Sequence, residues 1–210
     1  NTVLKFNEKI ITGVNIIDDL LFWTDNYSEP KKINIKDCIA GTNQNEPTLD
    51  TVPHTKLVVN GVELPDNIGE DHITVIRKSP KLAPSIKINE PTEANTSMLF
   101  EQVFPRFSLR YKYKDGEYSS FGPFTEVVFN PAYTEDFSVD DFYSTKESYN
   151  TAMVNNIKSI QIEKFVSSDI PKDVTQVEIL YKEDGSPVVF SIKTIDYDDA
   201  EWTDNTYTLE

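Results

Sequence analysis

Residues 106–129 read RFSLRYKYKDGEYSSFGPFTEVVF, and this stretch decides the fold class. Apolar and polar residues alternate from Phe107 to Tyr113, which is typical of a strand with one buried face. Asp115-Gly116 follows as a residue pair that tight hairpin turns favour, because both central positions of such a turn need positive φ. Gly122-Pro123 then interrupts the returning strand. The stretch therefore predicts an antiparallel β domain of the sandwich type.

Similar strand patterns cover most of the remaining chain. Asn60-Gly61 predicts a second tight hairpin, and Ile17-Asp18-Asp19 predicts a turn near the N-terminus. No segment keeps a helical period for long, so we expect an all-β protein. Beyond the opening stretch, strands are expected over residues 3–12, 14–23, 31–35, 56–59, 72–77, 85–88, 157–163, 174–181 and 188–195.

Composition limits the partners that the chain can have. Its 210 residues suffice for one large domain or two ordinary ones, and 12 Phe, 10 Tyr and 2 Trp supply core material that suits sheets. The formal charge of −15 repels nucleic acid and anionic membranes, so we expect no nucleic acid partner. No run of 18 apolar residues occurs, so we expect no membrane span. The acidity serves either solubility or contact with a cation or a basic partner.

Cys38 is the only cysteine, so the chain forms no internal disulfide. This argues against a small extracellular scaffold built on disulfides. No family signature of a thiol nucleophile surrounds Cys38, and we expect a buried, inert thiol. The sequence begins with Asn rather than Met, and we expect it to be a fragment of a longer protein.

No catalytic or metal-binding constellation stands out in the sequence. Carboxylates gather at residues 135–141 and 196–204, but neither group has the spacing of an EF-hand loop, so we expect solvated acidic loops and no metal or cofactor. His54 and His72 lie in unrelated contexts without a nucleophile elbow, which leaves a catalytic triad unsupported. We therefore expect a protein that is not an enzyme.

Aromatic residues near turns are the best candidates for binding. A ring in such a position can stack on a sugar or anchor a protein partner. Packing in the core is the alternative role for each of them. The candidate binding residues are Tyr27, Tyr118, Phe121, Tyr143 and Tyr149.

Two short motifs occur twice in the chain. Tyr113-Lys114-Asp115-Gly116 is echoed loosely at residues 181–185, and Trp23-Thr24-Asp25-Asn26 recurs identically at residues 202–205. The echoes indicate either two related β modules or the reuse of common turn residues by chance.

Residues 106–129 and 174–195 resemble fibronectin type III modules. In that family a tyrosine of the penultimate strand precedes a Gly-x-x-Ser turn, and here Tyr111 and Tyr113 precede Gly116-Glu117-Tyr118-Ser119. The resemblance implies fibronectin III/immunoglobulin-like antiparallel sandwich modules. We expect a first module at residues 1–130, interrupted by a β-rich insertion at about residues 41–97. We expect a second module at residues 131–210, which is either complete or incomplete.

Four segments resemble virion structural proteins of tailed bacteriophages, particularly long β-rich tail, nozzle or portal-proximal proteins. They are residues 11–26 with 29–33, residues 72–80, residues 104–124, and residues 149–151 with 155–156. The resemblance implies a non-catalytic structural component of a phage virion that is made in the host cytoplasm. Its expected partners are copies of itself and other virion proteins. The alternative is a β-sandwich module that uses aromatic residues in its loops to bind a host receptor or a carbohydrate. The receptor would be a protein or a glycan of the host surface.

Overall fold

The computed structural model describes Leu4 and residues 10–42, 55–90, 98–131 and 153–210. The chain divides into two compact units, and each gathers segments that are far apart in the sequence. The first unit consists of Asn1–Lys78, Lys112–Ser120 and Pro171–Thr175, and the second of Ser79–Tyr111, Phe121–Ile170 and Gln176–Glu210. This division into units differs from the boundaries expected for the two modules, residues 1–130 and 131–210. Those module boundaries stay a prediction.

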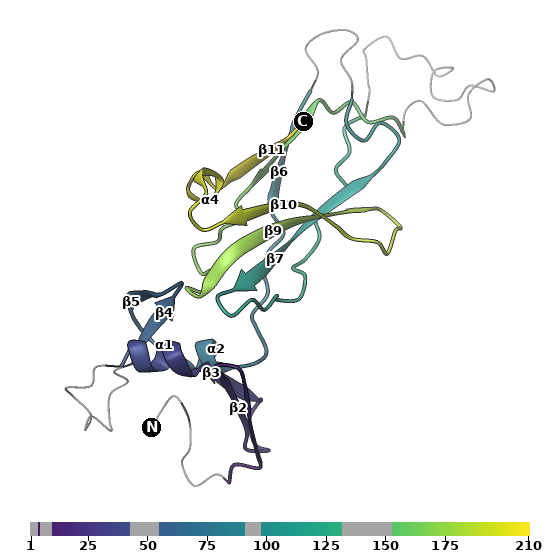
Figure 1. The fold of residues 1–210 in the computed structure, drawn as a ribbon. Coiled ribbons are helices and arrows are strands. Elements are labelled where there is room, and N and C mark those ends of the chain that lie inside the picture. The colour runs from purple at the N-terminus through teal and green to yellow at the C-terminus, as the bar shows by residue number, and fades with distance from the viewer. Residues whose placement is uncertain (1–3, 5–9, 43–54, 91–97, 132–152) are drawn as a thin grey trace, which may run out of the picture. The chain divides into compact units, whose positions relative to one another are not determined.

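The first unit opens with a three-stranded antiparallel sheet in the order β1-β2-β3 (Figure 1). β1 (Gly13–Ile17) and β2 (Leu20–Thr24) are joined by a two-residue loop in which Asp18 has a φ of 52°. β3 (Lys31–Asn34) pairs with the other side of β2. The strands and the turn predicted here are confirmed from residue 14 onward, while most of the strand predicted at residues 3–12 falls outside the described residues.

A short helix and a hairpin follow in the first unit. α1 (Ile35–Ala40) begins after Asn34, whose side-chain oxygen accepts a hydrogen bond from the Asp37 amide at 3.2 Å. β4 (Lys56–Val59) and β5 (Val62–Asn67) form the predicted hairpin. Asn60 and Gly61 both have positive φ, at 50° and 78°, as the tight turn requires.

The strand predicted at residues 72–77 is wrong. The chain instead forms α2 (Glu70–Ile73) and then runs irregularly. The Gly69 amide donates a hydrogen bond to His72 Nδ1 at 2.8 Å, which stabilises the first turn of α2. Ile73 and Arg77 are buried. These contacts outweigh the β propensity of the residues between them, because strand propensity is weak against tertiary packing.

The second unit contains two sheets, each with three antiparallel strands (Figure 1). The first has the order β10-β9-β7, with β7 (Pro105–Tyr113), β9 (Val174–Glu183) and β10 (Phe190–Asp196); β7 up to Tyr111 and β9 from Gln176 belong to this unit. The second has the order β11-β8-β6, with β6 (Ser85–Asn89), β8 (Ser159–Glu163) and β11 (Thr206–Leu209). The unit's most deeply buried apolar residues are Phe107, Leu109, Tyr111, Ile157, Ile160, Ile162, Phe165, Val177, Ile179, Leu180 and Ile195.

Residues 106–129 form one strand, followed by an irregular segment that runs back beside it. β7 carries the predicted alternation, but residues 122–128 run beside it without becoming a strand. The amides of Gly122, Thr125 and Val128 donate to β7 carbonyl oxygens at 2.8–2.9 Å. At Asp115-Gly116 only Gly116 has positive φ, so the expectation that both positions need it is wrong.

The identical tetrapeptides adopt different structures. Trp23 and Thr24 end β2, whereas Trp202-Thr203-Asp204 lies in α4 (Ala200–Asp204). The final asparagine of each has a φ of 54°. Asn tolerates the left-handed region better than most residues. The identical tetrapeptide therefore does not mark a shared structural module.

The described residues are mostly strands in antiparallel sheets with a few short helices, which agrees with the expected all-β class. The finer assignment to fibronectin III-like sandwiches is not tested by these features. Within the described ranges no helix has the length and apolar character needed to cross a membrane.

Candidate functional site

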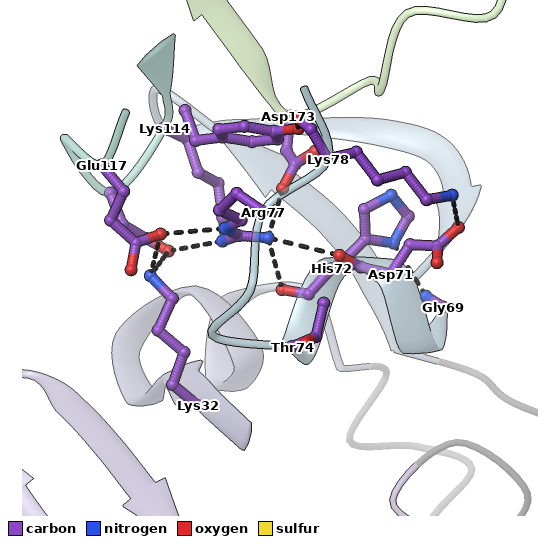
Figure 2. Close-up of polar contacts among 12 residues, drawn as sticks. Lys32, Gly69, Asp71, His72, Thr74, Arg77, Lys78, Lys114, Glu117 and Asp173 are labelled. Atoms are coloured by element: carbon purple, nitrogen blue, oxygen red, sulfur yellow. Dashed lines mark hydrogen bonds and ion pairs between the residues drawn. The ribbon is translucent and has the colours of Figure 1, made fainter. Parts of the chain in front are cut away.

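Arg77 is the centre of a group of buried charges in the first unit (Figure 2). Its Nε atom donates to Glu117 Oε2 at 2.9 Å, and its Nη1 atom lies 3.2 Å from Asp173 Oδ2. Nη2 lies 3.4 Å from Asp115 Oδ2. Nη1 also donates to the carbonyl oxygens of Asp71 and His72 at 3.3 Å. The guanidinium is suited to these contacts because its planar fork offers five donors.

Lys32, on β3, brings a second cation to the same carboxylates. Its Nζ atom lies 2.9 Å from Asp115 Oδ2 and 2.6 Å from Glu117 Oε2. Lys32 and its neighbour Lys31 are both buried, although adjacent strand residues point to opposite faces. The two carboxylates of the Asp115 turn are therefore shared by Lys32 and Arg77.

A third cation connects α1 and β4 to this turn. Lys114 Nζ lies 2.7 Å from Asp37 Oδ2 and donates to the Val58 carbonyl oxygen at 2.8 Å. The Lys114 amide donates to the Asp173 carbonyl oxygen at 2.9 Å. We call this set the charge cluster; its members are Lys32, Asp37, Arg77, Lys114, Asp115, Glu117 and Asp173.

Tyr113 covers the Arg77 guanidinium. The centre of the guanidinium lies 4.7 Å from the ring centroid, within the range of a cation–π contact. The Tyr113 hydroxyl donates to the Lys78 carbonyl oxygen at 2.6 Å. The ring is therefore fixed at both ends, and it shields the cation from water.

Burial perturbs two ionisable groups beside Arg77. Burial raises the pKa of Asp173 despite the opposing charge of Arg77, and Asp173 Oδ1 is a buried atom without a hydrogen-bond partner. Burial also lowers the pKa of His72. Because His72 Nδ1 accepts the Gly69 amide proton, the proton of the neutral ring sits on Nε2.

The centre of the cluster is enclosed by protein. The side chain of Arg77 is 2% exposed and that of Asp173 is 1% exposed. Their charged atoms contact one another and main-chain carbonyls, whereas a general acid or base must reach a substrate. A buried network of this kind fixes which segments come together, because removing one partner leaves an uncompensated charge. The arrangement is suited to holding four segments of the chain in one place.

The charge cluster could not be predicted from the sequence. Its signals were present but weak: two consecutive lysines in a short strand, and an Arg at the end of a run of β-branched residues. Acidic partners are too numerous among 35 Asp and Glu residues to single out Asp115, Glu117 and Asp173. Only the fold brings these positions together.

Among the predicted binding aromatics that the structure describes, Tyr27 is the most exposed. It is 76% exposed and lies in the loop after β2. The Asp25 carboxylate accepts hydrogen bonds from the Ser28 amide at 2.8 Å and from the Tyr27 amide at 2.9 Å. These amide bonds lower the pKa of Asp25 to about 2. A hydrogen-bonded turn therefore presents the Tyr27 ring to solvent.

The other predicted aromatics lie elsewhere. Tyr118, in the first unit, is exposed, and Lys112 Nζ lies 5.7 Å from its ring centroid. Phe121, in the second unit, is also exposed, and the Arg110 guanidinium lies 5.6 Å from its ring centroid. Tyr143 and Tyr149 lie outside the described residues. The rings of Tyr27 and Tyr118 come from different turns of the first unit.

The remaining predicted chemical groups are Cys38, His54 and the two acidic loops. Cys38 lies on α1, is half-buried, and has a thiol pKa that burial raises, which favours the unreactive form. The Asp199 carboxylate accepts the Asp196 amide proton at 2.8 Å, and Glu201 pairs with Lys193 at 3.1 Å. In the part of the chain that is described, no three His, Cys, Asp or Glu side chains are grouped to hold a metal ion. His54 and the carboxylates at 135–141 lie outside that part.

Comparison with known proteins gives no relative: no protein-family model matches the sequence, and no curated protein is significantly similar to it.

Proposed function

We propose that this protein is a non-catalytic structural component of a phage virion, in a tail or portal-proximal assembly, built on fibronectin III-like β modules. The observation that carries the structural role is the charge cluster, whose central members Arg77 and Asp173 are almost fully buried. Its charges are used to hold Lys32, the Asp115 turn and Asp173 together inside the first unit. The phage assignment is supported by the resemblance of the four segments named above.

The partners in this proposal are copies of the chain and other virion proteins, and its location is the assembled particle. A protein that bears mechanical load gains from antiparallel sheets, because each strand is held by a ladder of main-chain hydrogen bonds. Ties between residues such as Lys32 and Asp115, 83 positions apart, resist separation of the chain's segments. These features need no metal and no disulfide.

Two measurements on the intact system test the proposal. Mass spectrometry of purified particles of the phage that encodes this chain should find it at a stoichiometry typical of a ring or tube. Negative-stain electron microscopy of the purified full-length protein should show regular oligomers. Absence of the chain from the particles, together with a monomer at every concentration, would contradict a structural role in the virion.

Exposure of Tyr27 favours a second candidate, a host-receptor or carbohydrate-binding module. An exposed aromatic ring is what a sugar face stacks on. A glycan array probed with the full chain should then give saccharide-dependent signals that Tyr27→Ala removes. Tyr197→Ala, which also truncates an exposed tyrosine, is the matched control and should leave them unchanged. An array without any signal would remove this candidate.

A further inference from the structure

Lys32 and Asp115 form a buried ion pair between segments that are 83 positions apart in the sequence. The Lys32 Nζ atom lies 2.9 Å from Asp115 Oδ2, and the two side chains are 1% and 6% exposed. A second carboxylate contacts the same ammonium, since Glu117 Oε2 lies 2.6 Å from Nζ. Figure 2 shows the Lys32 side chain reaching toward Glu117. An amine, a buried carboxyl group and a neighbouring proton acceptor are therefore held together.

Main-chain hydrogen bonds fix the turn that carries Asp115. The Tyr113 amide donates to the Glu117 carbonyl oxygen at 2.8 Å, and the Gly116 amide donates to the Tyr113 carbonyl oxygen at 2.9 Å. Lys32 is fixed by β3, which pairs with β2. Because a C–O bond is about 1.2 Å long, Lys32 Nζ lies no more than about 4.1 Å from the Asp115 carboxyl carbon. Reacting atoms in a well-aligned site are about 3–3.5 Å apart, so only a small movement is needed.

We propose that Lys32 and Asp115 react to form an intramolecular isopeptide bond, with Glu117 as the group that transfers the protons. The bond joins Nζ to the Asp115 carboxyl carbon and releases one water molecule. An amide replaces the ion pair, so β3 and the turn after β7 become covalently linked. The reaction needs no oxidant, reductant or cofactor. It occurs once in each chain and acts on no other molecule.

The three side chains supply every atom and proton that the reaction requires. Glu117 first takes one proton from the Lys32 ammonium and passes it to the Asp115 carboxylate. The amine lone pair then attacks the neutral carboxyl carbon, and the C=O electron pair moves onto oxygen. Glu117 moves a second proton from nitrogen to the hydroxyl oxygen, the C–O bond breaks, and water leaves. Two protons of Lys32 and one oxygen of Asp115 make that water, and Glu117 ends in its original state.

Arg77 supports the reaction by electrostatics. Its Nη2 atom lies 3.4 Å from Asp115 Oδ2, so its charge stabilises the negative oxygen of the tetrahedral intermediate. The guanidinium keeps its proton throughout, which leaves Lys32 as the cation that reacts. Condensation removes one buried positive and one buried negative charge, and with them the cost of keeping this pair out of water. Effective molarities of about 10⁵–10⁸ M for well-placed groups offset the abundance of water, which favours hydrolysis.

Two other ion pairs of the first unit lack part of this arrangement. Lys114 Nζ lies 2.7 Å from Asp37 Oδ2, but it also donates to the Val58 carbonyl oxygen, which cannot transfer protons as a carboxylate does. Lys172 Nζ lies 2.7 Å from Asp66 Oδ2, but both side chains are exposed, so water surrounds the pair. We expect these two pairs to stay ionic.

Mass spectrometry of the denatured full-length chain tests the proposal. The intact mass should be lower than the mass calculated from the sequence by one water molecule. After proteolysis, a branched peptide should join the segment that contains Lys32 to the segment that contains Asp115. Fragmentation of this peptide should place the branch at these two side chains. Lys32→Met and Asp115→Ala should each have the calculated mass and yield no branched peptide.

Glu117→Gln separates the reaction from folding. The amide keeps an oxygen for the Arg77 Nε–H donor but does not take up a proton, so bond formation should slow at least about a hundredfold. Samples taken at intervals after a pulse of cell-free synthesis give the rates, and circular dichroism should match that of the wild type. Asp66→Asn, in the exposed pair with Lys172, is the matched control and should leave the rate unchanged.

One competing reaction also releases water. Asp115 and Gly116 can cyclise to a succinimide, but the Gly116 amide that must attack is held by the Tyr113 carbonyl oxygen. A succinimide stays within one peptide and reopens at mildly alkaline pH, whereas an isopeptide bond survives. A succinimide only, an unchanged intact mass, or a branch at Glu117 would overturn the proposal. None of these outcomes depends on the presence of the chain in phage particles, so the isopeptide bond and the virion role are tested separately.

Discussion

Arg77 Nη1 lies 3.2 Å from Asp173 Oδ2 across 96 positions of sequence, and both side chains are almost fully buried. The same guanidinium contacts Asp115 and Glu117, so one side chain connects three separate parts of the first unit. Buried charges of this kind add little net stability compared with an apolar core, but a single unpaired member is costly. The stability of the first unit therefore depends on the cluster being complete.

Replacement of Arg77 should destabilise the first unit strongly. Arg77→Ala leaves Asp173 and Asp115 without their shared cation, and we expect a loss of about 3–5 kcal/mol in the free energy of unfolding. Arg77→Lys should also destabilise, because an ammonium cannot reach all of the same partners. Urea unfolding followed by fluorescence measures both. The neighbouring Lys78→Ala removes only an exposed pair with Asp71 and should cost less than about 1 kcal/mol. Equal effects at the two positions would contradict the role given to Arg77.

Asp173 should make the protein less stable as the pH rises. Burial raises its pKa in the folded state above the ordinary value of 3.8, so the folded protein holds this proton more tightly than the unfolded chain. Its contribution is therefore full below pH 3.8 and is lost as the pH rises through the folded pKa. Asp173→Asn does not titrate, so its stability relative to wild type should increase with pH from pH 4 upward. Parallel stability curves for the two proteins would refute this assignment.

His72 should act in the opposite direction. Burial lowers its pKa below 6.5, so the unfolded chain takes up the proton first, and stability present above pH 6.5 is lost as the pH falls toward the folded pKa. His72→Asn keeps an acceptor for the Gly69 amide and does not titrate. The variant and the wild type should differ by a constant amount above pH 7, and the wild type should lose more stability between pH 6.5 and 5. Thermal melts across this range provide the measurement.

Gly41 should tolerate no side chain. A Cβ atom there would lie 2.3 Å from the Lys56 carbonyl oxygen, which is main chain and cannot move aside. We expect Gly41→Ala to cost about 1–3 kcal/mol, as forced overpacking does elsewhere. Gly13→Ala is the control, since its Cβ would meet Thr24 Cγ2 at an ordinary 3.6 Å. The denaturant midpoint of Gly41→Ala should be clearly lower than that of Gly13→Ala. Similar midpoints would show that the main chain at Gly41 and Lys56 moves apart to accept the added Cβ atom.

Local sequence signals predicted the parts of the fold that local forces decide. Asn60-Gly61 forms the expected hairpin because both residues accept positive φ at low cost. The alternation from Phe107 to Tyr113 gives β7 because one face of that strand is buried. In each case the residues involved are neighbours in the sequence, so the pattern contains the necessary information.

The failures occurred where distant residues decide the structure. Residues 72–77 have strong β propensity, yet the contacts of Arg77 with Glu117 and Asp173 hold that segment in another conformation. Trp202 lies in a helix and Trp23 in a strand within the same four-residue motif, so the motif itself specifies neither. The charge cluster was missed for the same reason, because its members are scattered over more than 140 positions from Lys32 to Asp173.

Because the first unit is built from separate segments of the chain, the order of synthesis limits when it can fold. Lys32 and Arg77 leave the ribosome early, but Asp173 belongs to the Pro171–Thr175 segment of the same unit. At 5–20 residues per second the roughly one hundred residues between Lys78 and Thr175 take about 5–20 s to translate. Lys32 and Arg77 can pair with Asp115 and Glu117 once synthesis has passed residue 117, but Arg77 lacks Asp173 until the end of that interval. The N-terminal part therefore cannot finish folding as it emerges, and it relies on the last third of the chain being made.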